Sequence, residues 1–81
     1  MAKRFKLKEK LLSGDQDKSF DFDQLCSLVL QLGFSERPGK GSHRIFYREG
    51  IPEIINLQPS GNKAKPYQVR QVRQILNAYH L

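Results

Sequence analysis

The spacing of apolar residues changes twice along this chain, and those changes constrain its fold more than any other feature. Apolar residues recur every three or four positions over residues 22–32 and again over 69–79, which is typical of helices with one buried face. In between, residues 42–48 and 53–57 read as strands, and residues 34–37 read as a short extended segment. The predicted order is therefore helix, three strands, helix.

The residues at the ends of both helices support this order. Asp21 can cap the first helix, and Gln24 three residues later fits a reciprocal capping pattern. Gly33 can end that helix in the left-handed conformation. Pro66 suits the first turn of the last helix, where its missing N–H is not needed.

The fold class that follows is α+β. Strands joined by short turns predict a three-stranded antiparallel sheet, with both helices covering one of its faces. Residues 20–81 form this domain, and residues 1–19 read as a short basic N-terminal extension that could contain a helix. A chain of 81 residues hides only about 60–65% of its unfolded surface and has one modest core.

The charge distribution favours an anionic partner. The formal net charge is +6, and the segment from Arg37 onward has eight basic residues against Glu49 and Glu53. A positive half of a small domain is the expected footprint of nucleic acid binding, although many small proteins are basic for solubility alone. Charge by itself leaves both interpretations open.

Other classes of protein receive no support from the sequence. The single cysteine, Cys26, lies on the apolar side of the first core helix, and no Cys/His cluster has metal-ligand spacing. No apolar run approaches membrane-spanning length, and no signal-peptide core follows the basic N-terminus. We therefore expect no metal, no cofactor, no membrane partner and a cytoplasmic location.

His43 is the strongest candidate for chemistry. It follows a basic glycine-rich turn, and its imidazole can move protons near neutral pH. Lys40, Arg44 and Arg48 lie near it in the sequence and could draw an anionic substrate to the same place. RNA cleavage needs little more than a base, an acid and positive charge beside the phosphate. Lys40 and Arg44 could hold that phosphate, Ser42 could orient the histidine, and Gly41 would let backbone N–H groups approach it. The alternative is a histidine that only satisfies a turn.

A second basic cluster precedes the last helix. Lys63 and Lys65 lie where free backbone donors favour phosphate binding, and Arg70 and Arg73 extend the basic surface. Tyr67, Tyr47 and Phe46 could stack on bases, although aromatic residues in so small a domain are more often part of the core.

Several segments together resemble one known family. Gly-Ser-His-Arg-Ile-Phe at 41–46, Ile-Ile-Asn-Leu at 54–57, Gly-Asn at 61–62 and Val-Arg-Gln-Ile-Leu at 72–76 resemble HicA toxins. These are small messenger-RNA-cleaving enzymes of prokaryotic toxin–antitoxin systems. The resemblance covers residues 21–81 and is most specific at the glycine-serine-histidine segment.

The resemblance implies a double-stranded-RNA-binding-domain-like fold and a metal-independent endoribonuclease whose catalytic residue is His43. It implies messenger RNA as substrate and a HicB-type antitoxin that covers the active face. It also likens Lys63 and Lys65 to the phosphate-contacting lysines of double-stranded-RNA-binding domains.

The chain departs from the family pattern in two places. Many members have a second histidine directly after the first, where this chain has Arg44, and the shortest members lack residues 1–20. His43 would then serve as both acid and base, or water or another side chain would take one role. A non-catalytic RNA-binding module, or a degenerate toxin, of the same fold is the alternative.

Overall fold

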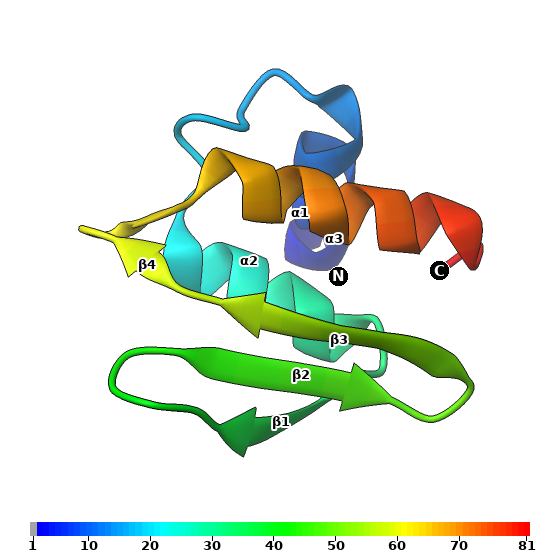
Figure 1. The fold of residues 1–81 in the computed structure, drawn as a ribbon. Coiled ribbons are helices and arrows are strands. Elements are labelled where there is room, and N and C mark those ends of the chain that lie inside the picture. The colour runs from blue at the N-terminus through cyan, green and yellow to red at the C-terminus, as the bar shows by residue number, and fades with distance from the viewer. Residues whose placement is uncertain (1) are drawn as a thin grey trace.

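The computed structural model describes residues 2–81, with side chains from Leu7 onward, and Met1 lies outside the described residues. It contains three helices and five strands (Figure 1): α1 (Ala2–Ser13), α2 (Phe22–Gln31), β1 (Ser35–Pro38), β2 (Arg44–Arg48), β3 (Ile51–Leu57), β4 (Pro59–Ser60), β5 (Lys63–Ala64) and α3 (Pro66–Ala78). The expected α+β class and helix–three-strand–helix order are confirmed. The second strand begins at Arg44 rather than Ser42, because residues 40–43 form a turn.

The sheet is antiparallel with the strand order β1-β2-β3. Ile45 pairs with Arg37 on one side and Asn56 on the other, so these side chains share one face of the sheet. Phe46 and Ile55 pair on the opposite face, and both are fully buried. The alternation predicted for this strand, with Ile45 and Tyr47 opposite Phe46, is confirmed.

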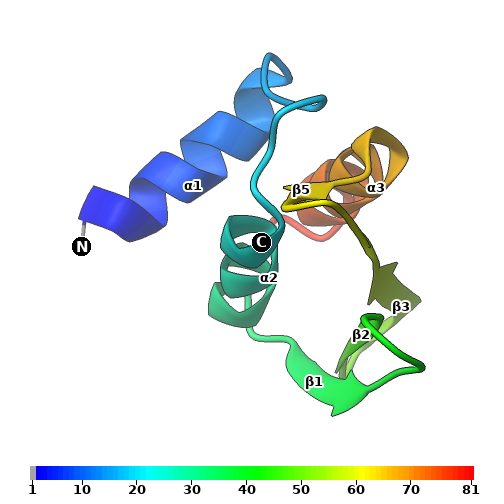
Figure 2. The same cartoon turned by 90° about the vertical axis from the view of Figure 1, so that its left-hand side faces the viewer.

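Both α2 and α3 cover the face that carries Phe46, and α1 lies on the side of these helices away from the sheet (Figure 2). The core combines the apolar stripes of α2 and α3 with the inner residues of the sheet. It includes the completely buried side chains of Leu25, Val29, Ile55 and Val69. The outer face of the sheet carries half-exposed Tyr47 and Ile54.

The start of α2 is capped as expected, but only in part. The Asp21 carboxylate accepts a hydrogen bond from the Gln24 backbone N–H at 3.1 Å. The predicted reciprocal bond is wrong, because the Gln24 side-chain oxygen accepts from Lys10 Nζ of α1 at 3.2 Å instead. Gly33 ends the helix region with a φ of +94°, as predicted.

A two-strand hairpin, β4–β5, connects the sheet to α3. It is anchored to the start of α2, where Phe22 N–H donates to the Asn62 carbonyl and Ala64 N–H donates to the Phe20 carbonyl. The residue pattern predicts no strand between residues 57 and 66, so this hairpin was not expected. The hairpin fixes where Lys63 and Lys65 lie relative to the core.

Helix α1 shares the core of the domain. Leu11 is completely buried, and its carbonyl accepts a hydrogen bond from the Arg73 guanidinium at 3.1 Å. The same guanidinium holds both oxygens of Asp17, at 2.8 and 3.0 Å. This bidentate contact lowers the pKa of Asp17. Leu12, the next residue of the helix, is 42% exposed.

Candidate functional site

The turn that precedes β2 positions His43. The His43 backbone N–H donates to the Lys40 carbonyl at 3.0 Å, which closes the turn. Gly41 has a φ of +59°, a conformation that side chains disfavour. A Cβ at Gly39 would lie 3.0 Å from the His43 Cβ, so a side chain there would have to push the histidine by a few tenths of an ångström. The local backbone geometry therefore explains why glycine is present at both positions, independently of any role in binding.

The half-buried His43 side chain opens onto a groove between β3 and α3. This groove has a volume of about 260 Å³. Its lining is mostly polar and amide-rich: His43, Ile54, Asn56, Gln58, Tyr67, Gln68 and Gln71. The sequence analysis singled out His43 and Tyr67, but it did not predict that they would line the same groove.

Gln68 forms the floor of the groove and is the residue that sequence reasoning missed. It is 3% exposed, although the sequence places it beside the apolar stripe of α3. Its Nε2 donates to the Asn56 carbonyl and its Oε1 accepts from the Gln58 N–H, both at 3.0 Å. Gln68 thus satisfies the free edge of β3, which no neighbouring strand covers.

Arg44 lies on the opposite side of β2 from His43. Its Nε and Nη2 donate to the two carboxylate oxygens of Glu36 at 2.6 and 2.7 Å. The contact lowers the pKa of Glu36 and raises that of Arg44. Because the strand alternates, the guanidinium is directed away from the face that His43 shares with Ile45. The phosphate role suggested for Arg44 stays a prediction.

The other predicted RNA-binding residues lie around the groove and along α3. Lys40, Gly41 and Ser42 are exposed in the turn, and Lys63 is exposed on β5. Lys65 directly precedes α3, and its Nζ donates to the side-chain oxygen of Gln58, a groove residue, at 3.0 Å. The basic side chain of Lys65 therefore lies next to the groove.

Arg70 lies on another side of α3. It is exposed, and its charge helps to lower the pKa of Asp17 on the α1 side of the molecule. The structure thus places Lys65 beside His43's groove, whereas Arg70 belongs to the side that faces the connector after α1.

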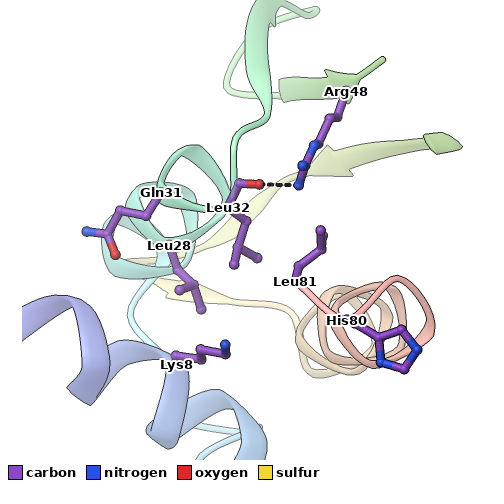
Figure 3. Close-up of a pocket in the computed structure, with 7 residues that line it drawn as sticks. All are labelled: Lys8, Leu28, Gln31, Leu32, Arg48, His80 and Leu81. Atoms are coloured by element: carbon purple, nitrogen blue, oxygen red, sulfur yellow. Dashed lines mark hydrogen bonds between the residues drawn. The ribbon is translucent and has the colours of Figure 1, made fainter. Parts of the chain in front are cut away.

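A larger hollow of about 370 Å³ lies at the other end of β2 (Figure 3). Leu28, Leu32 and Leu81 give it apolar walls, and Lys8 and Arg48 stand on opposite sides of it. Arg48 is held by a 2.6 Å hydrogen bond to the Leu32 carbonyl. Arg48, which was expected to help draw an anionic substrate to His43, lines this hollow instead. The hollow contains none of the other residues predicted to act on RNA, so we place the candidate site at the smaller groove.

Other reactive groups of the described residues point to no competing site. Cys26 is buried, and burial raises the pKa of its thiol to about 11, so it is unreactive near neutral pH. No group of three or more His, Cys, Asp or Glu residues within 2–81 is arranged to hold a metal ion. In the same part of the chain, no helix has the length and apolar character needed to cross a membrane.

Comparison with known proteins supplies the family. The family model described as HicA toxin of bacterial toxin-antitoxin matches residues 22–78, which span α2, the sheet, the β4–β5 hairpin and α3. No curated protein and no solved structure gives a significant match. The matched segment contains the whole helix–sheet–helix unit and the groove beside His43. The chain is a member of the HicA toxin family of bacterial toxin–antitoxin systems.

Proposed function

We propose that this protein is an endoribonuclease that cleaves messenger RNA and that His43 is its catalytic residue. The observation that carries the proposal is the position of His43, half-buried in a polar groove beside a basic turn. A proton-transfer group in such a setting suits chemistry on a phosphodiester. Membership of the HicA family supports the same activity.

The proposed step uses a nucleophile that RNA itself provides. The 2′-hydroxyl oxygen attacks phosphorus and loses its proton, while the bond from phosphorus to the 5′ oxygen breaks and that oxygen gains a proton. The products are a 2′,3′-cyclic phosphate and a 5′-hydroxyl. His43 can take the first proton or supply the second, and the step needs no metal ion.

Positive charge near the groove stabilises the negative phosphate oxygens during this step. Lys40 lies in the same turn as His43, and Lys65 contacts Gln58 of the groove. Gly41 and Ser42 offer backbone and hydroxyl donors from the turn, and Lys63 and Arg70 bind RNA farther from the cleaved bond. Arg44 contributes only through donors that its contact with Glu36 leaves available.

We further propose a HicB-type antitoxin as the partner and the cytoplasm, where messenger RNA is translated, as the location. The antitoxin would cover the groove and keep RNA away from His43. The family belongs to toxin–antitoxin systems, which supports an inhibitory partner of this kind.

One observation favours a second function, RNA binding without cleavage. Arg44 occupies the position where the second histidine of many family members would lie, and it is paired with Glu36. His43 is the only histidine, aspartate or glutamate side chain that lines the described groove. A degenerate toxin would keep the basic surface and lose the chemistry.

Expression of the parent chain and of His43→Ala from an inducible promoter separates these functions. We expect the parent to stop growth and fragment messenger RNA, and the variant to be folded and harmless. Purified parent should give cyclic-phosphate ends with a chelator present. If neither the parent nor the variant harmed the cells, the non-catalytic binding module would be favoured. If both were equally toxic, His43 would have a structural role only.

A further inference from the structure

The groove beside His43 offers two amide side chains that the fold does not use. Gln68 is fully engaged with the edge of β3, and the Gln58 side-chain oxygen accepts from Lys65. Within the described part of the chain, the side chains of Asn56 and Gln71 form no hydrogen bond, although both line the groove. An amide provides both a donor and an acceptor, which is the combination that reads the edge of a nucleobase.

Tyr67 adds an aromatic surface at the same groove. Its side chain is 57% exposed, yet its hydroxyl lies 3.4 Å from Nε2 of the buried Gln68. Tyr67 therefore lines the groove and contacts its buried glutamine while much of its side chain stays exposed. Exposed aromatic rings on nucleic-acid-binding proteins stack with unpaired bases of any sequence.

The dimensions and charges of the groove indicate which part of RNA it receives. A volume of about 260 Å³ is smaller than most small-molecule pockets, which begin at about 300 Å³, so the groove suits one base. Past Gln71 the surface continues into a hollow that contains Glu53, whose carboxylate repels phosphate. Lys65 lies on the opposite side, beside Gln58, so the phosphate chain should leave in that direction.

We propose that this groove binds a single unpaired base of the RNA, stacked on Tyr67 and hydrogen-bonded by Asn56 and Gln71. The inference rests on the proposed function of the same site and adds the class of substrate. A base inside a duplex stays paired and stacked and cannot enter the groove. The substrate is therefore single-stranded RNA, even though the fold resembles a double-stranded-RNA-binding domain.

Binding measurements on the full chain test this without requiring cleavage. The probes are a fluorescein-labelled single-stranded 2′-O-methyl RNA of mixed sequence and a duplex of the same length, both with the internal nucleophile blocked. We expect the single strand to bind more tightly than the duplex. Tyr67→Leu should weaken single-strand binding about tenfold or more, and Tyr67→Phe, which keeps the ring, should stay within about threefold of the parent.

Tyr47→Leu is the matched control, because Tyr47 is 42% exposed but lies outside the groove. It should leave single-strand binding unchanged. Gln71→Ala, which keeps Tyr67 intact, should also weaken binding, and thermal unfolding checks that each variant is folded. Duplex binding as tight as single-strand binding, or equal effects of Tyr67→Leu and Tyr47→Leu, would overturn the proposal.

The proposed function fails in a different experiment. If His43→Ala cleaves unmodified RNA like the parent, the catalytic assignment is lost while the binding result stands. If the parent cleaves RNA but the Tyr67 variants bind like the parent, the base site is lost and the enzyme remains.

Discussion

The two sides of α3 differ in how they use their polar side chains. On the side that faces α1, the Arg73 guanidinium donates three hydrogen bonds, two to Asp17 and one to the carbonyl of the completely buried Leu11. On the side that faces β3, Gln71 and the ring of Tyr67 are open to a groove. One helix thus separates a closed, stabilising side from an open one suited to binding. Stability and RNA binding should be separable by mutation.

The largest expected effect is on the closed side. Leu11→Ala removes a fully buried side chain and should lower the free energy of unfolding by about 2–5 kcal/mol, measured by urea denaturation. Leu12→Ala, on the exposed side of the same helix, should change it by less than about 0.5 kcal/mol. RNA binding per folded molecule should not change. If Leu11→Ala weakened RNA binding without lowering stability, the two sides of α3 would not have separate roles in stability and binding.

A substitution at Gln68 should affect both stability and RNA binding. Gln68→Leu leaves the Asn56 carbonyl and the Gln58 N–H without these partners. A fully buried unpaired group costs about 1–3 kcal/mol, and these two cost less because they are only partly shielded from water. We expect lower thermal stability together with weaker RNA binding, because the floor of the groove loses its anchor. Gln68→Glu keeps the acceptor for Gln58 and should be intermediate in stability at neutral pH. Parent-like stability of Gln68→Leu would show that water replaces these bonds without cost.

Acid should weaken the closed side specifically. The Arg73 side chain lowers the pKa of Asp17 below its unfolded value of about 3.9, so the pair stabilises the fold above that pH. This stabilisation is lost as the pH falls through the lower, folded-state pKa. Asp17→Asn should lower stability at neutral pH by about 1 kcal/mol or less.

Urea denaturation between pH 7 and pH 2 measures this effect. The difference in unfolding free energy between Asp17→Asn and the parent should become smaller below about pH 4. Asp15→Asn, which removes an exposed carboxylate from the same connector, is the control. If this difference in unfolding free energy did not depend on pH, the charge of Asp17 would not be the cause of the stabilisation.

The smallest expected effect is at the exposed basic surface. Lys63 is exposed on β5, so Lys63→Ala should leave thermal stability unchanged. RNA affinity should fall modestly, and the slope of log affinity against log salt should decrease in magnitude by about one. An unchanged slope would remove Lys63 from the RNA-binding surface.

The sequence predicts the fold well because its signals are local. The apolar stripe of α2, the cap at Asp21, the left-handed Gly33 and Pro66 at the start of α3 each depend on neighbours within a few residues. The position of His43 between a glycine turn and a strand is local in the same sense. Its catalytic role stays a prediction.

The groove could not be predicted because it depends on contacts between distant segments. Gln68 reads as a surface residue until β3 is placed beside α3, and Gln24 reads as a capping residue until Lys10 approaches it. Arg44 likewise reads as a free cation until β1 brings Glu36 to it. A glutamine beside an apolar stripe was the only signal for the buried amide.

Pro52 has a consequence for how this molecule behaves in a crowded solution. The ladder between β2 and β3 is irregular between Phe46 and Arg48, and Pro52 lies in the part of β3 opposite this irregularity. Proline has no N–H to offer there, and Gln68 already occupies the Asn56 carbonyl. The other edge, β1, has only four residues and ends at Pro38. Neither edge presents a long unbroken row of free backbone groups, so edge-to-edge pairing with a second copy is disfavoured.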